Sequence, residues 1–218
     1  MTPKTIIDIW EYSSKPSEEV RKLSILPDGC RDLISIHAPN EKPVWFVSNL
    51  LKHVHTPRAI SHHTRLKGYR LNFDVTINTP KLLEHLSVEH EHSEDIIFEH
   101  AQQNSNLHEA LATIADADNA FHSIDQYAKS CGISRRSFQR LLKEQTGHSA
   151  LYWRQLARVR NAGRLTTQHD RLSEIAYDAG FSDQAHMNRE FKQWFGVTPK
   201  EFAQSTVLHQ QLNSPAFA

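Results

Sequence analysis

The sequence contains only two cysteines, Cys30 and Cys131, and no run of 18 consecutive apolar residues. Two cysteines cannot build the disulfide framework of a small secreted domain, and such scarcity is typical of a reducing compartment. No segment is long and apolar enough to predict a membrane span, and residues 1–10 lack the apolar run of a signal peptide. We therefore expect a cytoplasmic protein without a membrane partner.

The sequence also lacks net charge, since 25 basic side chains balance 25 acidic ones. This balance hides an asymmetry on either side of a polar, acidic stretch that ends at Asn119. Residues 1–119 contain 12 basic and 17 acidic side chains, whereas residues 120–218 contain 13 and 8. A chain of 218 residues has room for two domains with separate cores. The sequence thus predicts an acidic and a basic half, and the basic half indicates a polyanion partner.

The basic half contains one pattern twice, 48 residues apart. An alanine is followed four positions later by a glycine, an apolar residue and a serine, at Ala128 with Gly132-Ile133-Ser134 and at Ala176 with Gly180-Phe181-Ser182. Two steeply crossing helices need a small residue at the crossing and a glycine that can take positive φ in the turn. Two copies with one period are stronger support than a single match. The pattern predicts two helix-turn-helix units within residues 120–205.

In the first unit, Ser123 and Gln126 have the spacing of a capping box, and Ser134 is expected to cap the second helix. Ile133 is expected to fill the junction between the helices. The inward-facing residues at helical spacing are Tyr127, Ala128, Cys131, Phe138, Leu141 and Leu142.

The second unit follows the same plan, with its second helix expected to start at Ser182. Its inward-facing residues are Leu172, Ile175, Ala176, Phe181, Met187, Phe191 and Trp194 or Phe195. Thr198 and Glu201 form a further capping box. Between the units, residues 151–165 are predicted to form one rigid linking helix that carries Arg154, Arg158, Arg160 and Arg164.

Residues 120–205 resemble the DNA-binding domain of the AraC/XylS family of bacterial transcription regulators. The most specific stretch runs from Ile175-Ala176 through Gly180-Phe181-Ser182 to Lys192, and it ends in the string from Gly196 to Phe202. The resemblance implies a seven-helix domain whose two recognition helices enter adjacent major-groove segments on one face of the DNA. Double-stranded DNA would then be the main partner, and the protein would be nucleoid-associated.

The resemblance also implies roles for individual side chains on the two recognition helices. Arginine pairs bidentately with guanine and glutamine with adenine, and each pair discriminates by about 1–3 kcal/mol. The base-reading candidates are Arg136, Gln139, Arg140, Gln184, His186, Asn188 and Arg189. The phosphate-binding candidates are Arg135, Lys143 and Lys192.

The acidic half is predicted to be a mainly-β domain followed by helices, which makes the whole chain α+β. The strand-like runs lie within residues 20–77, at 22–26, 31–37, 43–47 and 67–77, and helices are expected over 79–117. The string Leu26-Pro27-Asp28-Gly29-Cys30 resembles a signature of the N-terminal domain in one subgroup of these regulators. Residues 206–218 are expected to be a polar tail.

In most members of the family, such an N-terminal domain binds a small effector or mediates dimerisation. Trp45, Phe46, Tyr69 and Phe73 could line a pocket, although aromatic residues on strands are more often core residues. A small-molecule effector, RNA polymerase and a second copy of the chain are candidate partners, and the sequence names no effector-binding residue. A domain that binds only a protein partner is a further alternative.

The fifteen histidines raise a metal-sensing alternative, through the close pairs His53 and His55, His62 and His63, and His90 and His92. No Cys-x-x-Cys motif accompanies them, so solvated histidines are favoured, and neither a metal site nor a cofactor is expected.

A second alternative makes Cys30 the nucleophile of an alkyl-transfer or thiol-sensing domain. No local pattern supplies a base to this cysteine. We therefore predict a protein that is not an enzyme and has no catalytic residues, and whose N-terminal domain modulates DNA binding.

Overall fold

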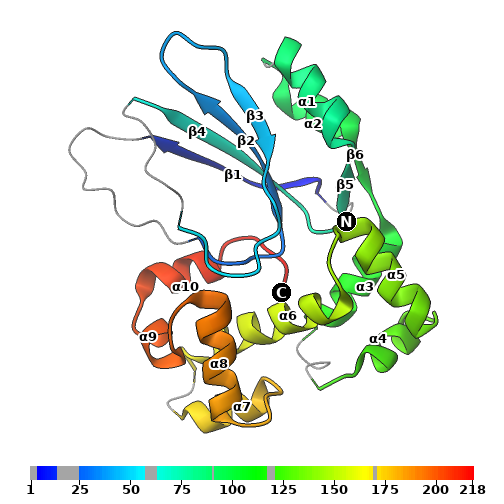
Figure 1. The fold of residues 1–218 in the computed structure, drawn as a ribbon, viewed down its shortest axis with the longest axis vertical. Coiled ribbons are helices and arrows are strands. Elements are labelled where there is room, and N and C mark those ends of the chain that lie inside the picture. Colours follow the sequence, from blue (N-terminus) through cyan, green and yellow to red (C-terminus); the bar gives the residue numbers. More distant parts are fainter. Residues whose placement is uncertain (1–3, 14–24, 57–62, 90, 117–120, 169–170) are drawn as a thin grey trace. The chain divides into compact units, whose positions relative to one another are not determined.

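The computed structural model describes residues 4–13, 25–56, 63–89, 91–116, 121–168 and 171–218. These residues divide into two compact units. The first takes in the described parts of residues 1–23, 30–50 and 56–104. The second takes in those of residues 24–29, 51–55 and 105–218. Figure 1 shows strands and two helices in the first unit and helices in the second, which confirms the predicted α+β class.

The first unit is built on an antiparallel sheet with strand order β1-β4-β2-β3. Its strands are β1 (Ile6–Ser13), β2 (Arg31–His37), β3 (Val44–Val47) and β4 (Arg65–Leu71). The strands predicted at 31–37 and 43–47 are confirmed. The run 67–77 instead forms two strands, β4 and β5 (Val75–Ile77), because a turn at residues 72–74 separates them. β1 lies outside the predicted strand region, and only Ile25 and Leu26 of the run 22–26 are described, without a named strand.

Helices α1 (Thr79–Val88) and α2 (Ser93–His100) supply the apolar side chains that cover one face of this sheet. α1 begins where the Asn78 side chain accepts a hydrogen bond from the Lys81 N–H, with Pro80 in its first turn. The shared core consists of Leu33, Tyr69, Leu71, Leu82, Leu86, Ile96 and Ile97. After α2 the chain forms β6 (Ala101–Gln103), which pairs with β5, where the sequence analysis expected helix.

The four aromatic residues suggested as a pocket lining do not gather around one cavity. Tyr69 is buried in the core, and Trp45 stacks on it with ring centroids 6.2 Å apart. Phe46 is 40% exposed, and it follows Trp45 directly in β3, so it points to the opposite face of the sheet. Trp45 and Tyr69 are therefore core residues.

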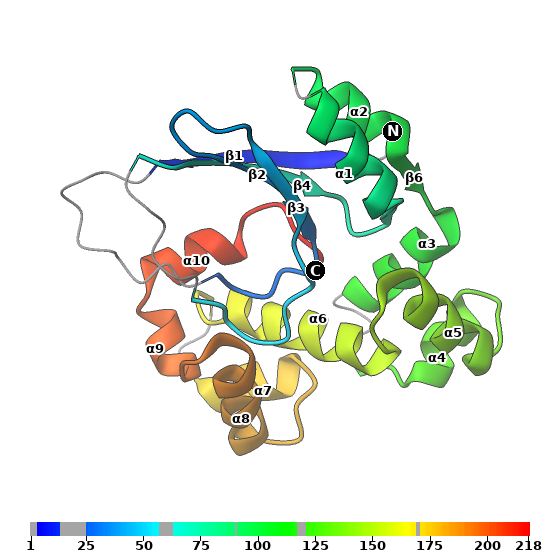
Figure 2. The ribbon, with the colours of Figure 1, turned by 45° about the horizontal axis from the view of Figure 1, so that its top comes forward.

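The second unit consists of helices arranged along a central helix, α6 (Ala150–Leu165), as Figure 2 shows. The other helices are α3 (Ser105–Ala115), α4 (Ile124–Ser130), α5 (Arg135–Thr146), α7 (Leu172–Asp178), α8 (Gln184–Phe195), α9 (Pro199–Ala203) and α10 (Thr206–Leu212). α6 begins at the N-cap Ser149 and buries Trp153, Leu156 and Val159. It is the predicted linking helix. No helix in the described residues is long and apolar enough to cross a membrane.

Two short segments from the N-terminal half of the sequence belong to this helical unit. The backbone N–H of Val54 donates to the carbonyl of Trp194 at 2.8 Å, and the Tyr152 hydroxyl donates to the carbonyl of Leu51 at 2.8 Å. Residues 25–29 are held in the same way, since the Phe217 N–H donates to the carbonyl of Asp28 at 2.9 Å. The Leu26–Gly29 part of the Pro-Asp-Gly-Cys string therefore packs among the C-terminal helices.

Residues 206–218, expected to be a polar tail, contain α10 and contribute to the core. Leu208 and Leu212 are buried at i, i+4 spacing, and the Ser205 side chain caps the helix. Phe217 is fully buried and packs edge-on against Trp153, with ring centroids 4.7 Å apart. The expectation was wrong because three well-spaced apolar side chains outweigh the polar average of this segment.

Candidate nucleic-acid interface

The two helix-turn-helix units use the same hydrogen-bonded turn. In the first, the Gly132 N–H donates to the carbonyl of Lys129 and the Ile133 N–H donates to the carbonyl of Ala128, each at 3.0 Å. In the second, Gly180 donates to Tyr177 at 2.9 Å and Phe181 to Ala176 at 2.8 Å. This pair of bonds is the Schellman motif, which requires a left-handed residue at the glycine position. Gly132 and Gly180 have φ values of 65° and 76°, as the sequence pattern predicts.

The second turn is one residue longer than the first. Ser134 caps α5 directly, whereas α8 is capped by Asp183, whose Oδ1 accepts the His186 N–H at 2.6 Å. The helix predicted to start at Ser182 therefore begins at Gln184, and the spacing between the copies changes from 48 in the turns to 49 in the helices. In this register Gln139, Arg140 and Lys143 of α5 correspond to Asn188, Arg189 and Lys192 of α8. Ala185 takes the place of Arg136, and His186 that of Ser137.

The outward face of α5 carries every candidate residue predicted for it. Arg135, Arg136, Gln139, Arg140 and Lys143 are exposed. All five line a groove of about 680 Å³ between the start of α4, α5 and the start of α6. Arg154 of α6 also lines this groove, and its Nε has no hydrogen-bond partner among the described residues. Sequence periodicity placed Arg154 only on the linking helix, and the fold brings it to the candidate interface.

Two of these cations already have protein partners. Arg135 donates to the Asp125 carboxylate at 2.8 Å, with both side chains more than half exposed. Lys143 donates to the carbonyl of Gly147 at 2.8 Å, at the C-terminal end of α5. These exposed contacts are weak and can exchange for a phosphate group.

The α8 candidates divide into an exposed and a half-buried set. Gln184, Arg189 and Lys192 are exposed, whereas His186 and Asn188 are half-buried. The His186 ring closes the cap of its own helix, because its Nδ1 lies 3.1 Å from the Ser182 hydroxyl and its edge meets the Phe181 ring. The carboxamide oxygen of Asn188 is buried without a hydrogen-bond partner in the described residues.

The second helix-turn-helix unit is fixed to α6 through Arg158. Its guanidinium lies 4.7 Å from the centroid of the Phe181 ring, donates to the carbonyl of Gly180 at 3.4 Å and lies 3.9 Å from the Glu190 carboxylate. Glu190 also accepts from the Trp194 indole N–H at 3.2 Å. Burial lowers the pKa of Arg158, and the neighbouring Glu190 opposes this shift. Arg158 therefore holds the turn and α8 against the linking helix.

The inward-facing residues predicted for the two helix-turn-helix units are largely confirmed. Tyr127, Ala128, Phe138 and Leu142 are buried in the first unit. The second unit buries Ile175, Ala176, Phe181, Met187, Phe191, Trp194 and Phe195. Cys131, Leu141 and Leu172 are half-buried.

Ile133 is the exception to this agreement. It does not fill the helix junction and remains 38% exposed. Tyr127 and Phe138 are instead the buried side chains that stack in this unit, with ring centroids 6.4 Å apart.

Comparison with known proteins places residues 127–205 in the family described as a helix-turn-helix domain. The arabinose operon regulatory protein of Salmonella typhimurium is 31% identical over 106 residues, which cover 47% of this chain and 37% of that protein. The multiple antibiotic resistance protein MarA of Escherichia coli is 29% identical over 97 residues, which cover 44% and 76%. A transcriptional regulator from Chromobacterium violaceum, described as an AraC-type DNA-binding domain-containing protein, has a TM-score of 0.42 at 25% identity, over 51% of this chain and 96% of that structure.

The matched residues 127–205 span the turns of both helix-turn-helix units and helices α5 to α9. Residues 127–205 therefore form a helix-turn-helix domain, and the similar proteins named above include transcription regulators. The match with the arabinose regulator spans 37% of that protein's length.

Proposed function

We propose that this protein is a sequence-specific, non-enzymatic transcription regulator that binds double-stranded DNA through α5 and α8. The observation that carries this proposal is the repeated Schellman turn, which in each unit is followed by a helix with exposed basic and amide side chains. An exposed recognition helix in such a unit can enter the major groove, where arginine and amide side chains distinguish base pairs. The two helices are joined by α6, so they would read adjacent segments of one site.

Within this function, each recognition helix has a proposed set of base contacts. Arg136, Gln139 and Arg140 would read one segment from the groove beside α5. Gln184, Asn188 and Arg189 would read the other, with His186 contributing only if its cap contacts open. Arg135, Lys143 and Lys192 would bind phosphates, and Arg154 joins them because it lines the α5 groove.

The compact unit that contains the four-stranded sheet is proposed to modulate this activity, as an N-terminal domain of the Pro-Asp-Gly-Cys subgroup. Its effector, a second copy of the chain and RNA polymerase are further proposed partners. The structure does not favour the nucleophile alternative, because Cys30 is only 5% exposed. Burial also raises the pKa of the other thiol, Cys131.

The test is selection of bound sequences from a random duplex pool with the full chain, followed by binding measurements on the selected site. We expect a site with two conserved segments one helical turn apart. Arg140→Ala should relax base preference in one segment and Arg189→Ala in the other. Arg171→Ala removes an exposed arginine from outside both recognition helices and should change neither. Equal affinity for selected and scrambled duplexes would refute sequence-specific binding, and equal losses on both for Arg140→Ala would refute its base-reading role.

A further inference from the structure

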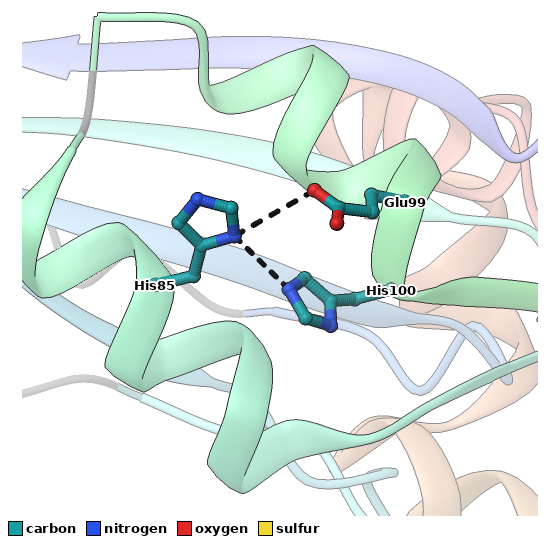
Figure 3. Close-up of side chains that lie close together, drawn as sticks. All are labelled: His85, Glu99 and His100. Carbon is teal, nitrogen blue, oxygen red and sulfur yellow. Dashed lines mark hydrogen bonds and ion pairs between the residues drawn. The ribbon is translucent and has the colours of Figure 1, made fainter.

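Three potential metal ligands come together in the compact unit that contains the four-stranded sheet, and they lie outside the helix-turn-helix domain in sequence. They are His85 in the last turn of α1, and Glu99 and His100 at the end of α2. Figure 3 shows the three side chains pointing toward one another. In the described part of the chain, they are the one group of three histidine, cysteine or carboxylate ligands with ligand atoms all within 4.8 Å of one another. None of the histidine pairs noted in the sequence belongs to this group, and His62 and His90 lie outside the described residues.

The two helices that carry these ligands, α1 and α2, pack together in a shared hydrophobic core. Leu82 and Leu86 of α1 are buried in one core with Ile96 and Ile97 of α2. His85 follows Leu82 by three residues and His100 follows Ile96 by four, so each histidine lies near the buried side of its helix. Strands β5 and β6 also connect the start of α1 to the end of α2. Ala101, which follows His100, pairs with Ile77, which lies just before α1.

The distances between the ligand atoms suit one small cation. His85 Nδ1 lies 3.1 Å from His100 Nε2 and 3.7 Å from Glu99 Oε2. Ligand atoms on a tetrahedral zinc ion with bonds of about 2.0–2.1 Å lie about 3.3 Å apart. The two imidazole rings stand edge to face, at 89° with centroids 5.4 Å apart, so their nitrogens converge without stacking of the rings. Small adjustments of the exposed Glu99 side chain would complete three coordination bonds.

We propose that His85 Nδ1, His100 Nε2 and a carboxylate oxygen of Glu99 bind a divalent transition-metal ion of the zinc type. The two imidazole nitrogens favour zinc over magnesium and calcium, which prefer oxygen ligands alone, and zinc also accepts the carboxylate oxygen. Metal binding replaces the 3.1 Å hydrogen bond between the two imidazoles, and the ring that donated it becomes the neutral tautomer with its proton on the other nitrogen. Glu99 is 66% and His85 36% exposed, so a fourth coordination position faces solvent and can hold water or a small ligand.

The test is titration of the full chain with Zn²⁺, in competition with a chromophoric chelator. We expect one tightly bound ion per chain and a rise of the melting temperature with Zn²⁺ concentration, because the ion binds the folded state. His85→Gln, His100→Gln and Glu99→Gln should each weaken zinc binding at least tenfold. Co²⁺ should give visible absorption bands that these substitutions change.

The matched control is the Glu89→Gln, His92→Gln double variant, at the C-cap of α1 and the N-cap of α2. This pair has a similar contact, 3.1 Å between His92 Nδ1 and Glu89 Oε1, but offers only two ligands. The control should keep full zinc affinity. Absence of a stoichiometric zinc ion, or equal zinc binding by the control and the three ligand variants, would overturn the proposal. Glu99→Gln keeps the test valid if a histidine variant misfolds, because the Glu99 side chain is largely exposed and lies outside the core. DNA binding is measured separately, so the two proposals fail independently.

Discussion

The guanidinium of Arg160 donates a hydrogen bond to the carbonyl oxygen of Pro27 at 3.2 Å, across 133 residues of sequence. The same buried group donates to the backbone oxygens of Leu212 and Ala218, each at 2.9 Å. Residues 25–29 are thereby fixed to the linking helix, and after Cys30 they continue directly into β2 of the first unit. A signature-like string in the acidic half thus serves as part of the helical unit.

Loss of this guanidinium should destabilise the helical unit. Arg160→Met keeps much of the side-chain volume but removes the donor to the backbone oxygens of Pro27 and Leu212, while Ala218 keeps its hydrogen bond from Arg164. Because an unsatisfied buried polar group costs about 1–3 kcal/mol, we expect the free energy of unfolding to fall by about 3 kcal/mol or more. Chemical denaturation measures this change. Arg171→Met, at an exposed arginine, should alter stability by less than about 0.5 kcal/mol, and a similarly small effect at Arg160 would contradict the assigned role.

Gly29 should tolerate no side chain. It has φ of 73°, and a Cβ there would lie 2.7 Å from Phe217 Cβ and 2.9 Å from the Trp153 ring. Gly147 has φ of 76° but open space around the same position. Gly147→Ala should therefore cost about 1 kcal/mol from backbone strain alone, and Gly29→Ala clearly more. Thermal unfolding of both variants makes the comparison, and equal losses would show that Phe217 and Trp153 do not crowd this glycine.

The largely buried contact between Arg158 and Glu190 should couple the second helix-turn-helix unit to α6. Removal of one partner from a buried ion pair is expected to cost about 3–5 kcal/mol, because the other charge stays buried. Glu190→Met and Arg158→Met should each destabilise the protein, and the double variant should lose much less than the sum of the two. Urea unfolding of all four proteins gives the coupling energy. Additive losses would mean that the two side chains act independently.

Lys143 and Arg140 should differ in their effects on DNA binding, given the proposed function. Lys143→Ala removes a point charge, so it should weaken selected and scrambled duplexes alike. It should also reduce the slope of log affinity against log salt by about one. Arg140→Ala should lower affinity mainly for the selected duplex, by about 1–3 kcal/mol. Fluorescence anisotropy at several salt concentrations separates these outcomes, and identical behaviour of the two variants would remove the distinction between phosphate and base contacts.

The cap of α8 should weaken in acid. The backbone N–H of His186 holds the pKa of Asp183 below its usual range, with help from Arg189 and Ser182. A lowered pKa means that the carboxylate stabilises the folded state above its unfolded pKa of about 3.9, and that this contribution disappears as pH falls through the lower folded value.

Asp183→Asn tests this pH dependence, because asparagine can still cap the helix but does not titrate. The melting temperature of the wild type should exceed that of Asp183→Asn near pH 6, and the difference should shrink between about pH 5 and pH 2. Glu144→Gln, within α5, serves as the control for removal of an exposed carboxyl. A difference that stays constant with pH would contradict the assignment.

Local sequence patterns predicted the repeated unit well, because its turns depend on short-range geometry. Gly132 and Gly180 had to take positive φ, and Ser123 and Ser134 cap their helices through residues three positions away. The one-residue extension of the second turn was missed because Ser182 and Asp183 are both good N-cap residues. Only the backbone shows that Asp183 is used.

The sequence predicted which side chains of the candidate interface are exposed, but it did not predict which residues surround them. Helical periodicity placed Arg140 and Arg189 on outward faces, which the structure shows as exposed. Periodicity could not tell that Arg160 is buried, that Arg158 is half-buried or that Arg154 lines a groove, since the sequence places all three on one helix without showing what packs against it. Their environments depend on which other segments pack against α6.

The sequence by itself determined the two helix-turn-helix units, the linking helix and the strands at 31–37 and 43–47, because their signals lie within a few residues of each other. Tertiary structure decided that residues 25–29 and the segment after residue 205 pack with the C-terminal helices. It also brought His85 and His100 within 3.1 Å of each other. Such pairings join residues far apart in the chain, and they depend on the burial of shared apolar surface, which no local spacing encodes.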